Sequence, residues 1–262
     1  MTQRQLRQSL TEKWLLIDIG NTALTFQGFE QGQFSNIFSM LNGDIPKNVG
    51  KLASSGLIDS NTYLVITSVV PKLSTLVKKF FKNNPPKKIL EVGKNLPVKF
   101  SHKYNNINSL GNDRKVNIFG AIELYGGPCV VMDFGSAITA DYISVDNKFY
   151  GGFIIPGPKT ALSALLENTA LLPKTSTIPK KMRGFLGQST SDCIQNGILM
   201  GYASMADGLA AQFRRRYGKS IRFIATGGYA ETIAPLTTSF DRIDPGHTLR
   251  SLALLALSHT AH

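Results

Sequence analysis

The chain has 262 residues, of which 42% are hydrophobic and 18% are charged, and it carries a formal net charge of +12. This composition disfavours intrinsic disorder, collagen and coiled coil, and the length allows one large domain or two small ones. The excess charge is local, because residues 71–103 carry nine Lys and one Glu, and residues 174–183 carry four basic residues and no acid. Such a run can bind polyanions but is more often a solvated face, so we do not expect nucleic acid as a partner.

Cysteine usage and the N-terminal segment bear on location. Cys129 and Cys193 are too few for a disulfide scaffold and lack the CxxC spacing of a zinc or redox site. Both are expected to be buried thiols in a reducing compartment. The first 14 residues are polar, and no stretch approaches the roughly 20 apolar residues of a membrane span. We therefore expect a cytoplasmic protein without membrane contact.

In the first half of the chain, predicted strands and helices alternate in a pattern typical of an α/β fold. Residues 14–19 form an apolar run that ends at Gly20, and alternation resumes at 24–29, which predicts a strand, a tight turn and a strand. The remaining expected elements are a helix at 45–57, a strand at 63–67, a helix after Pro71 that buries Phe80 and Phe81, a strand at 88–92, and a helix from Asn112 to the glycines at 126 and 127. The apolar face of that last helix is expected at Val116, Phe119, Ile122 and Leu124.

The second half restates the beginning. An apolar strand at 129–134, a turn at Gly135 and a strand at 139–145 repeat the opening pattern, and the two turns lie 115 residues apart. This self-similarity predicts a duplicated fold, with a polar tail at 1–13, an N-terminal lobe at 14–127 and a C-terminal lobe at 128–262. The further expected elements are a strand leading into residues 151–157, a helix to Leu171, an exposed basic loop at 173–188, a long helix at 191–217, a strand at 221–225 and a final helix at 245–257.

Two Asp-x-Gly turns can carry chemistry. A phosphate chain needs backbone N–H donors without a Cβ in the way, which Gly20 and Gly135 allow, and the hydroxyls of Thr22 and Ser136 can add donors. A carboxylate at the strand end can hold a cation. One such turn also ends ordinary hairpins, but a nucleotide held between two lobes explains both turns together with the Gly-rich turn at 226–228. The sequence has neither GxxxxGK[ST] nor GxGxxG, which disfavours P-loop and Rossmann phosphate sites.

The sequence Gly111-Asn112-Asp113-Arg114 opens a predicted helix and has two readings. In the structural reading, Asn112 or Asp113 satisfies free N–H groups at the helix start and Arg114 is solvated. In the functional reading, the Asp is a base near an anionic substrate, and the neighbouring Arg binds that anion through a bidentate fork. The residues alone leave both readings open.

Seven ordered motifs give the chain a family resemblance. They are Asp18-x-Gly-Asn-Thr22, Ser68-Val-Val-Pro71, Tyr104 seven residues before Gly111-x-Asp-Arg114, Asp133-x-Gly-Ser-Ala137, Gly151-Gly-x-Ile-x-Pro-Gly157, Thr190 seven residues before Gly197, and Thr226-Gly-Gly228. In order and spacing they resemble the type III pantothenate kinases over residues 14–257. The resemblance implies the acetate and sugar kinase, Hsp70 and actin superfamily, whose two ribonuclease-H-like (actin-like ATPase) lobes close on ATP. It also implies ATP-dependent phosphorylation of pantothenate to 4'-phosphopantothenate, the first step of coenzyme A biosynthesis.

The resemblance implies roles for individual residues. Asp113 would be the catalytic base that accepts the proton of the pantothenate hydroxyl. Asp18 would lie near the magnesium of Mg-ATP, and Asp133 would help bind the potassium or ammonium ion on which the family depends. The pantothenate contacts would be Tyr104, Gly111, Asn112, Asp113, Arg114 and Thr190. The ATP phosphates would be cradled by Asp18, Ile19, Gly20, Asn21, Thr22, Ala23, Leu24, Thr25 and Ser136.

The chain departs from the family pattern at a few positions. Ser136 stands where the family usually has Thr, which keeps the hydroxyl, whereas Ile138 stands where another Thr is common, which removes one. The segment 245–251 also differs from the usual Leu-x-Leu-x-Gly pattern. Two other functions stay open beside the kinase: a non-catalytic relative acting as a transcription accessory factor, and a kinase for another small hydroxy acid.

The resemblance further implies a homodimer with a two-fold interface built largely from residues 157–217. The predicted helix at 191–217 supports this with an apolar stripe and small residues that allow close approach. The stripe is expected at Ile194, Ile198, Met205 and Leu209, and the small residues at Gly197, Gly201 and Ala203. The alternative is that this stripe packs within its own core.

Overall fold

The computed structural model describes residues 12–45, 58–82, 85–173 and 177–260. The chain divides into two compact units. The first comprises Met1–Phe100, Asn105–Leu124 and Gly246–His262, and the second comprises Ser101–Tyr104 and Tyr125–Pro245. The change of unit after Leu124 lies close to the predicted boundary at 127. The last residues of the chain group with the first unit, whereas the sequence placed them in a C-terminal lobe.

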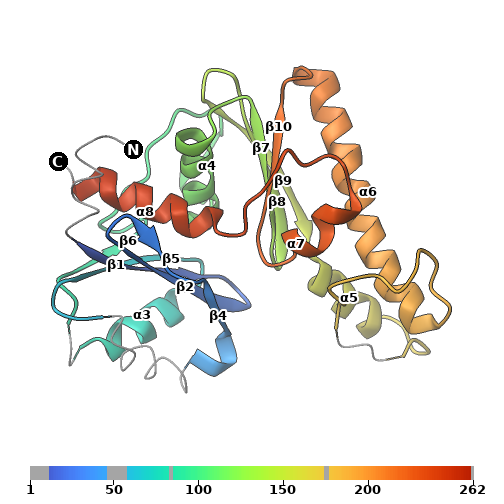
Figure 1. The fold of residues 1–262 in the computed structure, drawn as a ribbon, viewed down its shortest axis with the longest axis horizontal. Helices are drawn as coiled ribbons and strands as arrows, with labels where there is room; N and C mark the ends of the chain where they lie inside the picture. Colours follow the sequence, from blue (N-terminus) through green and yellow to red (C-terminus); the bar gives the residue numbers. More distant parts are fainter. Residues whose placement is uncertain (1–11, 46–57, 83–84, 174–176, 261–262) are drawn as a thin grey trace. The chain divides into compact units, whose positions relative to one another are not determined.

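The first unit is built on a six-stranded sheet (Figure 1). Its strands are β1 (Lys13–Ile19), β2 (Ala23–Glu30), β3 (Gln33–Phe34), β4 (Phe38–Leu41), β5 (Thr62–Ser68) and β6 (Lys88–Glu91). The strand β1 runs antiparallel to β2 and parallel to β5, so the order is β3-β2-β1-β5-β6, with β4 paired to β2. The predicted strand, turn and strand at the start of the chain are confirmed as β1 and β2.

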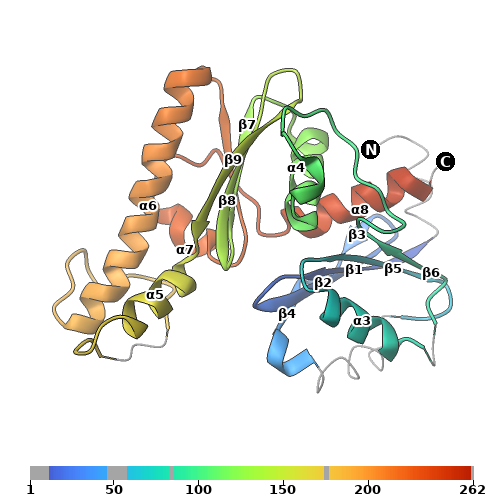
Figure 2. The same cartoon turned by 180° about the vertical axis from the view of Figure 1, so that it is seen from behind.

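Helices cover both faces of this sheet. They are α3 (Pro71–Phe80), α4 (Asn112–Leu124) and α8 (His247–Thr260), with 3-10 turns at η1 (Asn42–Asp44) and η2 (Ile107–Ser109). Alternate residues of β1 point to opposite faces. Leu15 and Ile17 pack with Val77 of α3, whereas Trp14 and Leu16 pack with residues of α4 and α8. Figure 2 shows α3 on one side of the sheet and α8 on the other.

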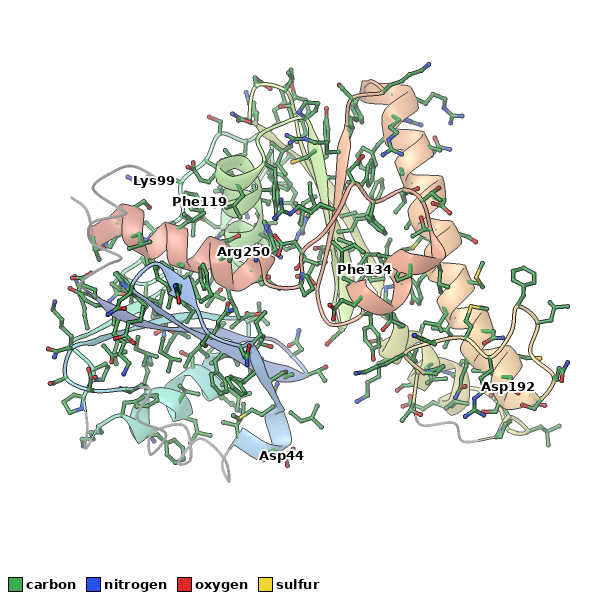
Figure 3. The ribbon with its side chains drawn as sticks, viewed as in Figure 1. Asp44, Lys99, Phe119, Phe134, Asp192 and Arg250 are labelled. Carbon is green, nitrogen blue, oxygen red and sulfur yellow. The ribbon has the colours of Figure 1, made fainter. Side chains whose placement is uncertain are left out.

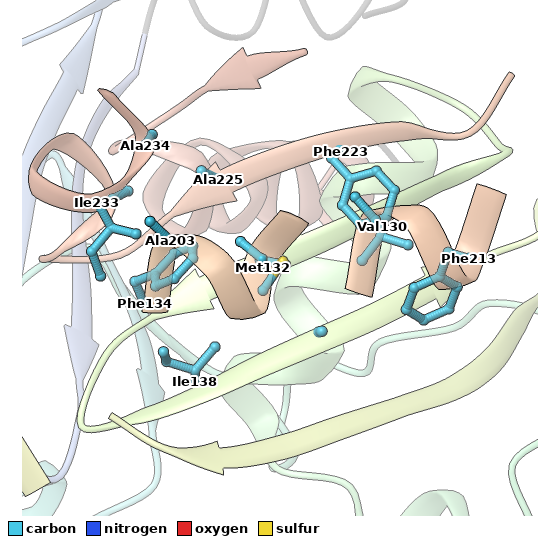
Figure 4. Close-up of a cluster of buried hydrophobic side chains, with 14 of the residues drawn as sticks. Val130, Met132, Phe134, Ile138, Ala203, Phe213, Phe223, Ala225, Ile233 and Ala234 are labelled. Carbon is cyan, nitrogen blue, oxygen red and sulfur yellow. The ribbon is translucent and has the colours of Figure 1, made fainter. Parts of the chain in front are cut away.

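The second unit has a five-stranded sheet and one long helix. Its elements are β7 (Cys129–Phe134), β8 (Ala137–Ile143), β9 (Phe149–Pro156), α5 (Pro158–Glu167), α6 (Thr190–Tyr217), β10 (Arg222–Thr226), α7 (Ala230–Ile233), η3 (Ala234–Leu236) and β11 (Arg242–Ile243). Val130, Met132 and Phe134 of β7 pack against Ala203 and Phe213 of α6 in one buried cluster (Figure 4).

The two sheets share one topology, which confirms the predicted duplication. The second sheet has the order β11-β10-β7-β8-β9, in which β7 is antiparallel to β8 and parallel to β10. In each sheet the first strand, β1 or β7, has antiparallel strands on one side and two parallel strands on the other. The antiparallel strands are β2, β3 and β4 in the first sheet and β8 and β9 in the second. This is the ribonuclease-H-like arrangement that the sequence led us to expect in both lobes.

Local chemistry sets the ends of the long helix α6. Ser189 accepts a hydrogen bond from the backbone N–H of Asp192 at 3.1 Å and donates its hydroxyl to the Asp192 carboxylate at 2.7 Å. Figure 3 shows Asp192 at the N-terminal end of this helix. Arg214, Arg215 and Arg216 occupy the last turn, where positive charge is favourable, and Gly218 ends the helix at a φ of 113°.

Some element boundaries differ from the expectation. The helix α5 ends at Glu167 rather than at Leu171, which is 96% exposed. The short strands β3, β4 and β11 and the helix α7 were not predicted, because two to four residues carry too little periodicity. The predicted helix at 45–57 lies outside the described residues, except for Ile45, which is buried. Of the predicted tail at 1–13, residues 1–11 lie outside the described residues and Lys13 begins β1.

The buried face of α4 is a correction. Val116 is buried as expected, but Arg114, Asn117 and Ile118 are buried too, whereas Leu124 is 38% exposed. The reason is the partner helix α8, which packs so closely that a Cβ at Gly120 would overlap Ser251. A contact made 131 residues later in the chain therefore chooses which face of α4 is covered.

Candidate active site

The first Asp-x-Gly turn joins β1 to β2 and is held by a residue from outside it. The backbone N–H of Gly20 donates to the carbonyl of Ala23 at 3.0 Å. The side-chain amide of Asn42 donates to the carbonyls of Gly20 and Asn21, at 2.9 and 2.8 Å, and the backbone N–H of Asn42 donates to Thr22 at 2.9 Å. Three bonds from one residue therefore fix the turn that is predicted to hold ATP phosphates.

Not every predicted ATP contact can act through its side chain. Asn21 and Thr22 are exposed, and Asp18 and Thr25 are half-buried. Ile19 and Leu24 are fully buried in the hydrophobic core, so these two can offer only backbone atoms to a ligand. Sequence reasoning missed Asn42, for which the available signal was an Asn-Gly-Asp turn that follows a short strand.

The second Asp-x-Gly turn is braced in a similar way. The backbone N–H of Gly157 and the hydroxyl of Thr160 both donate to the carbonyl of Ser136, at 2.9 and 2.7 Å. A Cβ at Gly157 would overlap the backbone of Gly135 and Ser136, so only glycine allows this approach. The Gly151–Gly157 motif thus meets the turn from the far end of β9.

The Gly-rich turn at 226–228 lies against Asp133. Gly227 has a φ of 89°, and a Cβ there would overlap both the Asp133 carboxylate and the backbone of Phe134. The backbone N–H of Tyr229 donates to the carbonyl of Phe134 at 3.1 Å. The second unit therefore brings the Asp133 turn and the Gly-rich turn together.

The Gly111–Arg114 segment starts α4. The carbonyl of Gly111 accepts the backbone N–H of Lys115 at 3.0 Å, and the Asn112 amide donates to the carbonyl of Val92 at 3.1 Å. Asp113 accepts the backbone N–H of Arg114 on Oδ1 at 2.7 Å, which is favourable at the positive end of a helix. Its Oδ2 accepts no hydrogen bond from the described residues.

These hydrogen bonds bear on the two readings of residues 111–114, the helix cap and the catalytic base. Asn112 does not cap α4, because its side chain is tied to Val92. Asp113 does satisfy one free N–H, as the structural reading expected, yet it keeps one carboxylate oxygen for another partner. Arg114 is only 7% exposed, so the expectation of a solvated side chain was wrong. A buried guanidinium is stable only among partners for its charge.

The two remaining predicted pantothenate contacts belong to the second unit. The Tyr104 ring is half-buried, with its centroid 5.4 Å from that of Phe149. Thr190 is exposed and is the first residue of α6. A hollow of about 620 Å³ beside it is lined by Arg183, Gly184, Phe185, Leu186, Gln188 and Asp192. The four residues 111–114 are thus contiguous at the start of α4, whereas Tyr104 lies in a loop and Thr190 begins α6.

Asp18 and Asp133 fit the donor chemistry of hard cations. Each is a half-buried carboxylate two residues before the glycine of its turn, and the neighbouring strands carry hydroxyl groups. The described residues hold no group of three or more His, Cys, Asp or Glu side chains that could bind a metal. A cation at either Asp would therefore need ligands from hydroxyls, carbonyls, water or the substrate phosphates, which is how Mg²⁺ is usually held.

The lysine-rich segment makes local contacts. Glu91 is buried and binds Lys78 at 2.6 Å, Lys94 at 2.9 Å and the Ser74 hydroxyl at 2.7 Å. Burial alone would raise the pKa of Glu91, but these hydrogen bonds outweigh it and hold the pKa below its usual value. Lys87 lies 4.7 Å from the centroid of the Tyr63 ring. Part of the charge in this segment thus stabilises the first unit.

The cysteines are free thiols, but only Cys129 is buried as expected. Burial raises the pKa of Cys129 to about 12. Cys193, in the first turn of α6, is exposed, and its thiol donates to the carbonyl of Gly187 at 3.4 Å. In the part of the chain that the structure describes, no helix is both long and apolar enough to cross a membrane.

Comparisons with known proteins agree with one another. A family model of type III pantothenate kinase matches residues 14–212. A type III pantothenate kinase of Dehalococcoides mccartyi is 31% identical over 260 residues, covering 95% of this chain and 97% of the relative. That of Persephonella marina is 35% identical and covers 83% and 88%. A crystal structure described as a conserved putative Baf family transcriptional activator from Campylobacter jejuni matches at a TM-score of 0.57 and 20% identity, covering 94% and 98%, and shows the fold alone.

Proposed function

The chain belongs to the type III pantothenate kinase family and phosphorylates pantothenate with ATP in coenzyme A biosynthesis, and from this premise we propose which residues do the work. Phosphoryl transfer depends mainly on positioning and on neutralising the charge of the phosphoryl oxygens. Residues of the two turns and of the α4 start perform these tasks.

Asp113 is the catalytic base. The observation that carries this assignment is its divided carboxylate: Oδ1 is held by the backbone N–H of Arg114, whereas Oδ2 is left for another donor. A carboxylate fixed on one side and open on the other can accept the proton of the pantothenate hydroxyl as that oxygen attacks the γ-phosphorus of ATP. General bases of this kind contribute about 10² to 10⁴-fold to the rate.

The two turns hold the phosphates of ATP. Their glycines present backbone N–H groups, and the hydroxyls of Thr22 and Ser136 add donors that stabilise negative charge. Support comes from the bracing described above, since Asn42 and Thr160 lock the two turns before any ligand arrives. Donors that are already in place need no reorganisation during the reaction.

Pantothenate is held by charged and polar groups of the α4 start, with Tyr104 and Thr190 as further contacts. Arg114 binds its carboxylate, because a guanidinium offers two parallel donors to a carboxylate. Gly111 and Asn112 contribute from the same helix start.

Two cations complete the site. Mg²⁺ would be held near Asp18 together with the ATP phosphates, and a monovalent ion, potassium or ammonium, near Asp133. When bound, they would supply positive charge that offsets the charge of the transferring phosphoryl group. Both carboxylates have hydroxyl-bearing neighbours, and oxygen donors are what such hard ions prefer.

The active enzyme is a homodimer with an interface in residues 157–217. Ala203 is buried in the hydrophobic core of the second unit, so it cannot line the interface as the sequence suggested. Met205 and Leu209 are partly buried against the same core. What supports the dimer is the outer face of α6, where a Cβ at Gly197 or Gly201 would meet nothing within 4 Å. A mid-helix glycine costs about 1 kcal/mol relative to alanine, which favours a use such as close approach of a second copy.

Exposed apolar residues near that face point the same way. Phe185 is 73% exposed, Leu186 is 76% exposed and Leu171 is 96% exposed. Large apolar side chains left exposed in this way are typical of an interface. We place the enzyme in the cytoplasm, where its phosphoryl donor ATP is formed.

The function is tested with the purified chain and a panel of acceptors. ADP release would be followed with pantothenate and with other small hydroxy acids, in sodium, potassium or ammonium salts, and the product identified by mass. We expect 4'-phosphopantothenate, low activity in sodium alone, and recovery in potassium or ammonium. Phosphorylation of another acid in preference to pantothenate, or no ADP release with any acceptor, would contradict the assignment, and equal activity in all three salts would remove the cation from Asp133.

A further inference from the structure

The two sheets carry the same row of polar residues. In the first sheet, Asp18 of β1 lies opposite Thr25 of β2 and opposite Thr67 of β5. In the second sheet, Asp133 of β7 lies opposite Thr139 of β8 and opposite Thr226 of β10. Residues directly opposite on neighbouring strands point to the same face of a sheet. Each unit therefore places one carboxylate between two threonines on one face, at the end where its turn begins.

In each row, the threonine on the parallel strand, β5 or β10, is buried and its hydroxyl group has no hydrogen-bond partner among the described residues. Thr67 and Thr226 are both 0% exposed, and the hydroxyl oxygen of each has no hydrogen-bond partner among the described residues. A buried hydroxyl without a partner is unfavourable, and valine would fill the same volume without that cost. An unsatisfied hydroxyl at one site needs no special explanation, but its repetition at the equivalent position of the second sheet indicates a shared use.

The neighbouring carboxylate indicates what these hydroxyls bind. Asp18 and Asp133 are the adjacent groups on the same face, so an anion placed there would meet a negative charge. A cation, or a water molecule bound to a cation, is attracted by the carboxylate and accepts an oxygen ligand from the hydroxyl. The glycine turn beside Thr226 also lets the backbone approach Asp133 closely.

We propose that Thr67 and Thr226 are ligand residues for the two cations, each completing with its hydroxyl oxygen the site begun by the Asp beside it. Thr226 acts on the monovalent ion at Asp133, and Thr67 acts on Mg²⁺, directly or through a bound water, at Asp18. The inference rests on the cation sites of the proposed function. It adds to them the residue that each half of the duplicated fold contributes from the strand that pairs in parallel with its first strand, β5 or β10.

The test compares valine and serine variants by ligand-induced thermal shift. Melting temperatures of the full-length chain and of Thr226→Val, Thr226→Ser, Thr67→Val and Thr67→Ser would be titrated with potassium chloride against sodium chloride, and separately with Mg-ATP. We expect Thr226→Val to need at least about tenfold more potassium for half of the shift, because valine removes one of the oxygen ligands of the ion. Thr67→Val should show the same loss toward Mg-ATP and keep its potassium response. Each serine variant should restore the response.

A matched control separates binding from stability. Thr62, on the same strand as Thr67, is also fully buried, but its hydroxyl donates to Asp59 at 3.0 Å. Thr62→Val should therefore lower the melting temperature without changing either titration. Thr226→Val and Thr67→Val should melt no lower than wild type when no ligand is present, because they remove an unsatisfied group.

The outcomes distinguish this inference from the proposal beneath it. If wild type responds to potassium and Thr226→Val responds equally, the role of Thr226 is overturned while the cation site stands. If Thr67→Val binds Mg-ATP as wild type does, the role of Thr67 is overturned. If wild type itself shows no difference between potassium and sodium, the monovalent site fails and the role of Thr226 fails with it.

Discussion

The side-chain amide of Asn42 donates to the backbone carbonyl of Gly20 at 2.9 Å and so joins two segments 22 residues apart. The same amide reaches Asn21, and the Asn42 backbone reaches Thr22. The turn between β1 and β2 is consequently held from outside by the residue that begins η1. Since this turn is proposed to hold ATP phosphates, we expect Asn42 to affect ATP binding through the turn.

Replacing Asn42 with alanine should therefore weaken ATP binding. We expect Asn42→Ala to raise KM for ATP about tenfold and to leave KM for pantothenate near wild type, because the lost bonds fix only the phosphate turn. Asn95 is a matched control: its amide donates to Ile89 at 2.8 Å and its carbonyl oxygen accepts from Glu91 at 2.7 Å. Asn95→Ala should lower stability without changing KM for ATP, and a loss of stability alone in both variants would contradict the role of Asn42.

Substitution of Arg114 by lysine should act on pantothenate. An ammonium group loses the fork that matches a carboxylate, so Arg114→Lys should raise KM for pantothenate by at least about tenfold with little change in KM for ATP. Because Arg114 is buried, the melting temperature of the Arg114→Lys variant should be measured together with its steady-state kinetics. An unchanged KM for pantothenate in a folded variant would assign Arg114 to packing.

The ion cluster at Glu91 predicts a pH dependence of stability. Its pKa is lower in the folded protein than in the unfolded chain, so its contribution is present above pH about 4.3 and is lost as the pH falls through the folded pKa. Glu91→Gln should unfold about 1 to 3 kcal/mol more easily at pH 7, and this difference should shrink below pH 4. Urea denaturation at a series of pH values measures the difference in unfolding free energy between wild type and Glu91→Gln. A difference that does not change with pH would contradict a stabilising role for the negative charge of Glu91.

A charge at Phe185 should separate the dimer. Phe185→Glu would place an unpaired carboxylate in the proposed interface, which is costly to bury. We expect the dimer to weaken at least about tenfold and KM for pantothenate to rise with it, while the melting temperature of the monomer stays near wild type because the residue is exposed. Light scattering at assay concentration measures the assembly, and a fully active wild-type monomer would contradict the role of the interface.

The sequence predicted the repeated parts of the fold well, for a physical reason. The strands β1 and β7 are apolar on both faces and end at an Asp-x-Gly turn, so their identity depends on local residues alone. The buried face of α4 depends instead on α8, and the turn at Gly20 depends on Asn42. Such contacts join distant parts of the chain, and no local pattern specifies them.

The candidate site divides along the same line. Motif order predicts Asp113 as a site residue, but the division of its two carboxylate oxygens follows from the helix geometry at Arg114. The rows around Asp18 and Asp133 depend on strand register, which places Thr67 and Thr226 opposite them. Neither threonine stood out in the sequence, because a single threonine at the end of an apolar strand is common.

The most direct test of the account is the turnover of Asp113→Asn. Steady-state kinetics with saturating ATP and pantothenate should show kcat at least about 100-fold below wild type, with an unchanged circular dichroism spectrum, because the amide keeps the hydrogen bond from Arg114 but cannot accept the proton. Asp59→Asn, an exposed acid of the same unit, should turn over as wild type does. A folded Asp113→Asn variant with near-normal kcat would contradict the assignment of Asp113 as the base. The role of Asp113 would then be limited to accepting a backbone N–H at the start of α4.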